Sequence, residues 1–491
     1  MSLDALYRFV LGIVFPFHRR CGVFTLSSMP RVHGEHRTLP QLPPDIWLEI
    51  FQFSTYIHRA KTIEPLDPFV LTPLSNDAMA VNSHHTSWRT KCALVLVCRP
   101  WRKIAIQLLY EHLVMKSPRR AKQILAVLSG SCQSPNDAIS SKPPIFSSEY
   151  GKWTRHLEIF THARGATRFH YLQIVFDIMK LCPNVRMLSG SWVAETPDQF
   201  LAGIAFMYGK SLEGLYWNEF TYSSAFTPLG FFSAFRALNI LDIRHYVGDG
   251  KAKNNLPLII SMPELRSLVL STYPSSLEAA NSLILPSLRN LTIDVTVDPA
   301  IVEESLSTFL KLHGMTLESV EITSSASSNA DRDGEDVLLP SPSRHLCPGR
   351  FLNPDTCQNL RSLIFSAKTP QFTPPSHPNL RRVGLRGIKP DSLYPNKACS
   401  TRSHLKALTR ERFPKLEVVR TIDFLVDAAA DFMIPDIFLW WSEKFDKQGI
   451  DFQDGAGVLW LYSDADAEAN TTEGLEVAAA EVVGPNWVWR R

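Results

Sequence analysis

The stretch "MPELRSLVLS", residues 262–271, contains the pattern that decides the fold of this chain. Leucines stand at every second position, 268 and 270, between outer serines at 267 and 271, which is the periodicity of a β-strand. Leu268 and Leu270 are therefore expected to point inward, and the residues beside them outward. A strand this short needs neighbours of the same kind to form a core.

Such neighbours are present, because the pattern apolar-x-x-apolar-x-apolar recurs along the middle of the chain. Most successive copies start 20 to 31 residues apart, with two longer intervals of 36 and 43. Intervals of this size are typical of leucine-rich repeats. The copies are "TRHLEI" at 154, "VRMLSG" at 185, "LEGLYW" at 212, "LNILDI" at 238, "LRSLVL" at 265, "LRNLTI" at 288, "LESVEI" at 317, "LRSLIF" at 360, "LRRVGL" at 380 and "LEVVRT" at 416.

Several intervals between copies favour helices, namely residues 169–182, 196–211 and 298–314. A strand that returns through a helix to the next parallel strand buries little by itself, and stacking makes the core continuous. The sequence therefore predicts an α/β fold over residues 150–423. We expect a curved leucine-rich-repeat-like solenoid with parallel strands on its concave face and helices outside. The alternative is an ordinary α/β domain whose buried strands share the pattern.

Changes in composition divide the rest of the chain. Residues 1–39 are expected to be a disordered or mis-annotated leader, with a targeting role as the alternative. The other expected regions are a helical part at 40–116 with a polar insert at 54–89, a helix and Ser/Pro-rich linker at 117–149, loop insertions at about 324–356 and 388–412, a capping segment with a last helix and a strand pair at 424–463, and an acidic tail at 464–491.

The helical part shows more apolar surface than so small a unit can bury. In "LPPDIWLEIFQF", residues 42–53, Pro44 suits the first turn of a helix and Asp45 complements the helix dipole. The apolar residues that follow have helical spacing and form a wide stripe. A second segment, "TKCALVLVCRPWRKIAIQLLYEHLVM" at 90–115, predicts two more helices around Pro100.

Together the two segments resemble the F-box motif. The match covers about residues 40–113, and its most specific part is the phrase "VC-x-x-W-R-x-I-A" at 97–105. The insert at 54–89 is a departure from the short connection usual in the family. An F-box followed by irregular leucine-rich repeats resembles the large family of fungal F-box proteins.

The resemblance implies that the helices bind the Skp-type adaptor of an SCF (Skp–cullin–F-box) ubiquitin ligase, and a cullin through it. The repeats would then hold a target protein, which makes the chain a non-catalytic substrate receptor. The alternatives are that the apolar residues pack a core of their own, and that the chain is a protein-binding scaffold outside a ligase. The implied adaptor-binding residues are Leu42, Pro43, Pro44, Ile46, Ile50, Phe51, Val97, Cys98, Trp101, Ile104, Leu108 and Leu109.

The outward strand positions of a solenoid form a continuous surface on which a target could bind. A mixture of charged and aromatic residues suits protein recognition, although an uncommitted solvated face has the same composition. By the repeat register the candidates are Tyr216, Asn218, Asp242, Arg244, Thr292, Asp294, Glu321 and Arg386.

Other classes of function find no support in the sequence. The net charge of +3 argues against nucleic-acid and polybasic membrane binding. The eight cysteines are scattered without a CxxC pair, as in a reduced protein of the cytoplasm or nucleus. We expect no catalytic residue, no metal site and no cofactor, because the "GIAFMYGKS" run at 203–211 lacks the spacing of a phosphate loop and the histidines lack metal-ligand spacing.

Overall fold

The computed structural model describes residues 42–70, 84–132, 148–161, 166–193, 196–219, 227–248, 259–324, 345–370, 375–396, 398–426, 433–461 and 488–490. The expected leader, most of the Ser/Pro-rich linker, the centre of the first loop insertion and most of the acidic tail lie outside these residues. The chain divides into two compact units. Unit 1 comprises Met1–Ile57 with Asp77–Tyr110, and unit 2 comprises His58–Asn76 with Glu111–Arg491.

Unit 1 contains three helices among its described residues: α2 (Pro44–Ser54), α5 (His84–Val97) and α6 (Arg99–Tyr110). Helix α2 begins at the predicted proline, because a residue without an N–H group loses nothing in the first helical turn. Helices α5 and α6 are separated at Cys98, and Pro100 is the second residue of α6, where a proline is tolerated. The core of the unit is a small apolar cluster of Phe51, Leu94, Ala105 and Leu108.

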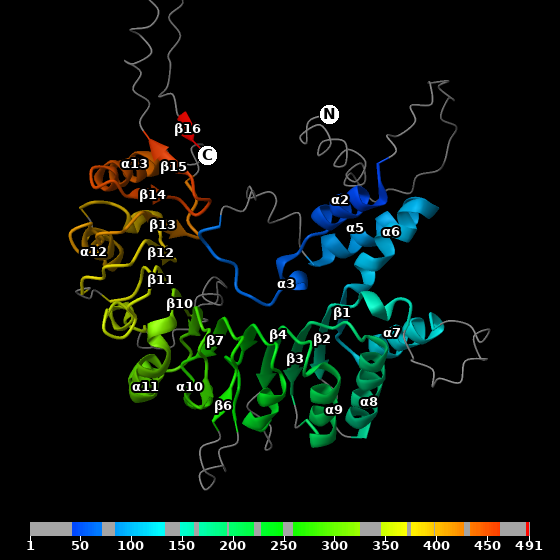
Figure 1. Cartoon of the computed structure of the whole chain (residues 1–491). Coiled ribbons are helices and arrows are strands. Elements are labelled where there is room, and N and C mark those ends of the chain that lie inside the picture. Colours follow the sequence, from blue (N-terminus) through cyan, green and yellow to red (C-terminus); the bar gives the residue numbers. More distant parts are fainter. Residues whose placement is uncertain are drawn as a thin grey trace, which may run out of the picture. The chain divides into compact units, whose positions relative to one another are not determined.

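Unit 2 is a mixed α/β structure built on a sheet of fourteen described strands (Figure 1). The strands from β1 to β14 pair in parallel, and β15 and β16 are added antiparallel. The strands are β1 (His112–Met115), β2 (His156–Thr161), β3 (Met187–Trp192), β4 (Gly214–Glu219), β5 (Ile240–Asp242), β7 (Ser267–Ser271), β9 (Asn290–Asp294), β10 (Ser319–Thr323), β11 (Ser362–Ser366), β12 (Arg382–Arg386), β13 (Val418–Ile422), β14 (Asp451–Gln453), β15 (Leu459–Leu461) and β16 (Val488–Arg490).

Each of the ten repeat copies contains a strand that begins two residues after the first letter of the copy. The second strand position of successive copies is an aliphatic residue, and these residues lie in register across the sheet, as Leu241, Leu268 and Leu291 do. All three are buried. The predicted strand pattern and its inward leucines are therefore confirmed, and with them a large, mostly parallel sheet.

Helices cover the face of the sheet to which these leucines point (Figure 1). Those expected at 169–182, 196–211 and 298–314 are α8 (Ala166–Leu181), α9 (Asp198–Tyr208) and α11 (Glu303–His313). The others are α7 (Pro118–Gly130), α10 (Pro274–Asn281), α12 (Ser400–Ala407) and α13 (Met433–Asp446), and a short pair, β6 (Ile260–Ser261) and β8 (Leu283–Ile284), forms a second sheet. No helix among the described residues combines the length and the apolarity needed to cross a membrane.

Three boundaries differ from those expected. The residues at 111–116 do not close the helical part, because β1 pairs with β2 and extends the sheet. Part of the polar insert, from His58 onward, belongs to unit 2 and begins with the short helix α3 (His58–Lys61). The expected acidic tail contains β16, whose main chain pairs with β15. Composition does not indicate these three boundaries, because each depends on contacts between segments that are distant in the sequence.

Candidate functional site

One side of α2 packs into the core of unit 1. Trp47 and Phe51 lie one helical turn apart, and their ring centroids are 5.8 Å from each other. Both rings contact Trp101 of α6, at 5.0 Å from Trp47 and 4.8 Å from Phe51. The aromatic residues of segments 42–53 and 90–115 thus form one cluster, and much of their apolar surface lies within it.

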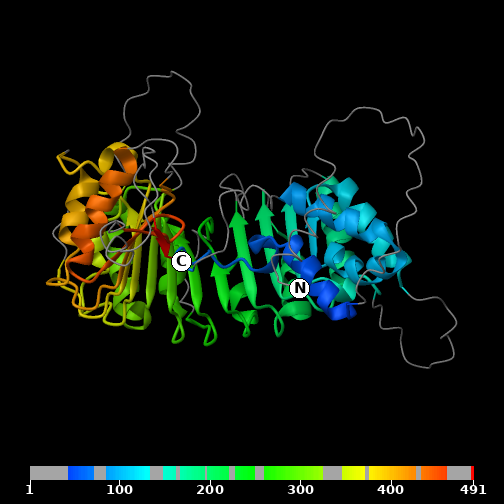
Figure 2. The same ribbon diagram turned by 90° about the horizontal axis from the view of Figure 1, so that it is seen from above.

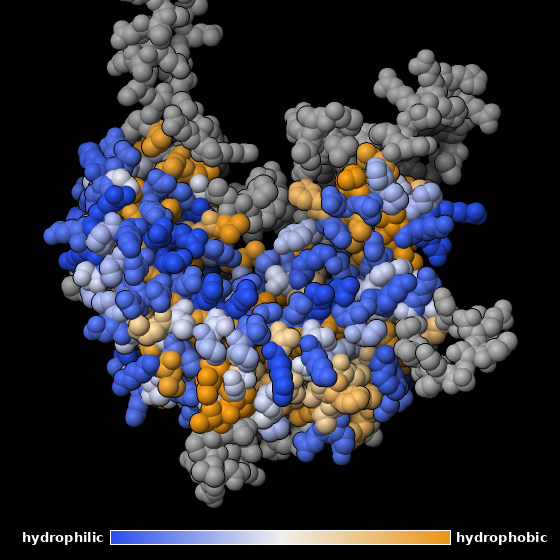
Figure 3. Space-filling model, in the orientation of Figure 1, coloured by the Kyte–Doolittle hydropathy of each residue, from blue (hydrophilic) through white to orange (hydrophobic). Residues whose placement is uncertain are grey.

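A second stripe on α2 stays at the surface. Ile46, Ile50 and Phe53 have the spacing of neighbours on one helix face, with Ile50 partly buried and the other two exposed. The exposed fractions are 41% for Ile46, 65% for Phe53, 82% for Leu96 and 55% for Val97. Figure 3 shows apolar residues gathered over α2, α5 and α6. Unit 1 therefore retains large apolar side chains in contact with solvent.

The structure divides the twelve residues expected to bind an adaptor. Phe51 and Leu108 are buried in the core of the unit and have no surface for a partner in this arrangement. Helical spacing alone could not show which side of α2 is buried and which is exposed. It also did not single out Phe53 and Leu96 as exposed apolar residues. Partly buried are Leu42, Ile50, Trp101, Ile104 and Leu109, and exposed are Pro43, Pro44, Ile46, Val97 and Cys98.

The eight residues expected to bind a target share the face of the sheet opposite the buried leucines. Seven of them occupy odd-numbered strand positions, as the pairs Tyr216–Asp242 and Thr292–Glu321 show, and Arg244 follows the end of β5. Asn218, Arg244 and Arg386 lie further along the same side, at the ends of their strands or just beyond them. Arrangement on one face follows directly from the two-residue period of a strand.

Part of this set is already engaged within the chain. Asp242 accepts hydrogen bonds from Arg244, with 2.6 Å between Oδ2 and Nη2, and is buried. Burial by itself would lower the pKa of Arg244, but the Asp242 carboxylate outweighs it and the pKa rises. Asp294 is buried in the same neighbourhood. The Asp242 and Asp294 side chains are therefore shielded from solvent in this arrangement.

A second ion pair joins β10 and β12 across the intervening strand β11. Arg386 contacts Glu321 at 2.7 Å and Asp423 at 2.7 Å. Glu321 is buried, and burial raises its pKa although the Arg386 guanidinium partly offsets this increase. The carboxylate of Glu321, one of the residues expected to bind a target, is thus paired with Arg386 within the chain.

The outward face is also covered by a segment that the sequence did not single out. Residues 62–70, which we call the strap, follow α3 and run across the strands on the side opposite α8–α11 (Figures 1 and 2). Near its start, the Glu64 carboxylate accepts hydrogen bonds from Ser267 Oγ at 2.7 Å and from Asn290 Nδ2 at 3.3 Å. Ser267 is buried, although it is an outward residue of β7.

The end of the strap is anchored over β11, β12 and β13. Phe69 is buried against Ile364 and Ile422. The guanidinium groups of Arg382 and Arg420 lie 4.9 Å and 5.5 Å from the centroid of its ring, which is the range of cation–π contacts.

Polar contacts hold the strap at the same place. Arg420 donates from Nη1 to the main-chain carbonyl of Pro68 at 2.6 Å. Asp67 lies 3.5 Å from Arg382, and it also accepts a hydrogen bond from the Phe69 amide at 2.9 Å. Sequence reasoning treated these residues as part of a polar loop. The only signal was the run "EPLDPF" at 64–69, where two large apolar residues, Leu66 and Phe69, stand in a polar, proline-containing stretch.

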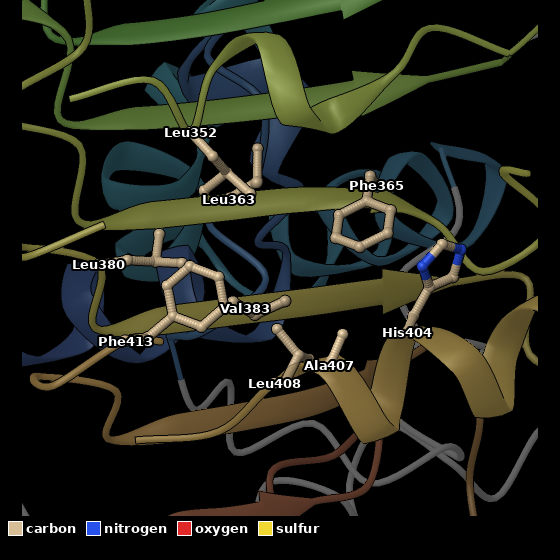
Figure 4. A pocket seen from close by; sticks show the side chains of 9 residues that line it. All are labelled: Leu352, Leu363, Phe365, Leu380, Val383, His404, Ala407, Leu408 and Phe413. Atoms are coloured by element: carbon tan, nitrogen blue, oxygen red, sulfur yellow. The ribbon is translucent and has the colours of Figure 1, made fainter. Parts of the chain in front are cut away.

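The enclosed cavity under the sheet is too small to bind a ligand. Its volume is about 10 Å³, near the size of one water molecule. Figure 4 shows apolar side chains of β11, β12 and α12 around it, with the His404 ring edge-on to Phe365. The lining residues are Leu352, Leu363, Phe365, Leu380, Val383, His404, Ala407, Leu408 and Phe413. In the part of the chain that the structure covers, no group of three His, Cys, Asp or Glu side chains could hold a metal ion.

Comparison with known proteins gives little further information. No family model matches the chain, and no curated protein matches it. A crystal structure of a Bacteroides fragilis protein from the Northeast Structural Genomics Consortium is similar at 15% identity and a TM-score of 0.27. The match covers 55% of this chain and 65% of that chain, slightly less than two thirds of its length. A likeness at this level says nothing about activity or partners.

Proposed function

We propose that this chain is the non-catalytic substrate-recognition subunit of an SCF-type E3 ubiquitin ligase. In this proposal α2, α5 and α6 are an F-box that binds a Skp-type adaptor and, through it, a cullin. The strands of unit 2 belong to a curved leucine-rich-repeat-like solenoid whose outward face binds a target protein. The site of action would be the cytoplasm, the nucleus or both.

The observation that carries the proposal is the division of apolar residues within unit 1. Phe51 and Leu108 fill a small core, while Ile46, Phe53 and Val97 remain exposed. Exposed apolar side chains concentrated on one small helical unit are typical of a surface that another protein covers. A partner helix or groove of complementary apolar character would suit it. This is the relation between an F-box and its adaptor.

Co-purification with a Skp-type adaptor tests the proposal. The full chain and the adaptor are co-expressed, and the adaptor retained by the tagged chain is quantified. We expect wild type to retain it and the Ile46→Asp/Val97→Asp variant to retain at least about tenfold less, since a buried unpaired charge costs several kcal/mol. Both positions are exposed, so the fold should survive the substitutions.

The matched control is Arg89→Asp/Lys103→Asp, which changes exposed charged residues of the same unit. It should retain the adaptor as wild type does. If folded wild type captures no adaptor, the ligase proposal is lost. The alternative, a protein-binding scaffold that acts outside a ligase, would then take its place.

A further inference from the structure

The strap contacts the sheet as a bound peptide contacts a protein. Among the described residues it makes no main-chain hydrogen bond to a strand, and its recorded main-chain bonds are local, such as Thr62 to His58 and Val70 to Asp67. Its contacts with the sheet are made at three places, Ile63 over Gly214 of β4, Glu64 over β7 and β9, and Asp67–Phe69 over β11–β13, where the Pro68 carbonyl also accepts a hydrogen bond from Arg420. Leu66, between these anchors, is exposed.

The residues under Phe69 form a surface that is complementary to one kind of ligand group. Arg382 and Arg420 are like charges on adjacent strands, and both face the same ring and carboxylate. Ile364 and Ile422 form the floor. Position 384 between them is a glycine, where an added Cβ would lie 3.3 Å from Phe69 Cζ and 2.3 Å from Ile422 Cδ1. An aromatic ring with a neighbouring carboxylate satisfies all of these groups at once.

We propose that this surface, formed by Ile364, Arg382, Gly384, Arg420 and Ile422, is a binding site for peptide segments that carry an aromatic residue two positions after an acidic one and fold into a turn there, as the strap does at Asp67–Val70. The strap occupies the site within the same chain, with Asp67 and Phe69 in the two roles. A target segment of this type binds by displacing it. The inference rests on the proposed function only in assuming that the outward face takes up a target.

The sequence of the strap fits the role of a displaceable ligand. Pro65 and Pro68 restrict its backbone conformations, which reduces the entropy lost on docking. A segment tethered on the same chain acts at an effective concentration of about millimolar. An external peptide of equal intrinsic affinity would therefore bind wild type weakly, and binding would become visible once the strap loses its anchors.

The test uses the full chain and a fluorescent peptide with the strap sequence, TIEPLDPFV. Peptide binding is followed by fluorescence polarisation with wild type and with a Glu64→Ala/Asp67→Ala/Phe69→Ala variant. We expect the variant to bind the peptide at least about tenfold more tightly than wild type, because the internal competitor is gone. A peptide with alanine in place of its Asp and Phe should not bind either protein.

Two further variants locate the site. Arg382→Glu, added to the strap variant, should weaken peptide binding at least about tenfold, since it places a like charge against the peptide carboxylate. Arg381→Glu is the matched control, because this neighbouring exposed arginine pairs with Glu417 and not with the strap. If the Arg382→Glu and Arg381→Glu variants bound the peptide equally well, the peptide would bind at another surface and the proposal would be overturned.

Wild type provides a measurement that does not depend on the variant folding. Excess peptide, at about millimolar concentration, should increase amide hydrogen exchange in residues 62–70 as the strap is displaced. The proposal is overturned if exchange there is unchanged by the peptide and the folded strap variant does not bind it. Adaptor co-purification is a separate measurement. If it failed, the ligase proposal would be lost, but the proposal of a peptide site under the strap would be unaffected.

Discussion

Arg420 donates a hydrogen bond from its guanidinium to the main-chain carbonyl of Pro68 at 2.6 Å, joining residues 352 positions apart in the sequence. Its other guanidinium nitrogens bond to Gln453, at 3.1 Å from Nε and 2.6 Å from Nη2. One buried side chain thus links the strap to β13 and β14. Burial lowers the pKa of Arg420, while Asp454 and Asp67 act against this decrease.

The first prediction concerns the energy with which the strap is docked. Phe69→Ala removes the buried apolar anchor of the strap, and burial of a phenylalanine contributes about 1.5–3 kcal/mol. We expect faster hydrogen exchange at residues 62–70 with little change in the sheet, because the strap can detach by itself. Leu66→Ala is the control, since Leu66 is exposed. A loss of stability through the whole of unit 2 would show instead that the strap is part of its core.

The second prediction separates the core of unit 1 from its surface. Phe51→Ala should destabilise the unit by about 3–5 kcal/mol, because it leaves a cavity among Leu94, Ala105 and Leu108. Phe53→Ala, two residues along the same helix, should change stability by less than about 0.5 kcal/mol. Denaturant unfolding followed by tryptophan fluorescence measures both. Similar losses in the two variants would contradict the burial of α2 described above.

The same pair of residues also separates stability from binding. Phe53→Ala leaves the core intact and removes exposed apolar area next to Ile46. If the proposed adaptor surface includes this stripe, adaptor capture should fall while the unfolding midpoint stays unchanged. Glu49→Ala, at an exposed position of the same helix, should alter neither quantity.

The third prediction concerns the ion pair between Arg386 and Glu321. Arg386→Met leaves the Glu321 carboxylate buried without its cation, which should cost about 3 kcal/mol near neutral pH. An acid whose pKa is raised by folding keeps its proton in the folded state where the unfolded chain has lost it. Its contribution to stability is therefore largest at low pH and falls as the pH rises through the folded pKa.

In the Arg386→Met variant this dependence should be stronger, because the group that opposed the increase in the pKa of Glu321 is gone. The difference in unfolding free energy between variant and wild type should shrink as the pH falls from about 7 to about 5. Chemical denaturation at several pH values measures it. A Glu321→Gln substitution added to the variant should remove the additional pH dependence that the loss of Arg386 introduces.

The sequence predicted the repeated strands well because each depends on a local pattern. A leucine at the second strand position, such as Leu268, is buried whatever its neighbours in space are. The strap could not be predicted in this way. Glu64 and Phe69 are held by Ser267, Arg382 and Arg420, and nothing near residues 64–69 in the sequence indicates these partners.

The candidate sites show the same limit. The two-residue period placed Asp242 and Glu321 on the outward face, but it could not show that arginines of the same chain already bind them. The helical period placed Phe51 on an apolar stripe, but it could not show which side of the stripe meets α6. Periodicity gives the face of an element, whereas tertiary packing decides what that face contacts.

The last prediction uses a buried histidine of unit 2. His377 is fully buried, with Nε2 3.0 Å from the Cys357 carbonyl and Nδ1 3.3 Å from the Asn379 amide nitrogen. Because the carbonyl accepts a hydrogen bond and the amide donates one, Nε2 carries the hydrogen and Nδ1 accepts. The neutral ring satisfies both groups, and a second proton would displace the Asn379 amide.

Burial accordingly lowers the pKa of His377, with the hydrogen bond to Cys357 acting against the decrease. A base with a lowered folded pKa stabilises the fold above its ordinary pKa of 6.5, and this contribution is lost as the pH falls. We expect wild type to lose stability between about pH 7.5 and pH 5, and His377→Gln to lose less over that range. His170→Gln, at an exposed position, should follow wild type. If His377→Gln showed the same pH dependence as wild type, protonation of this ring would not contribute to acid destabilisation.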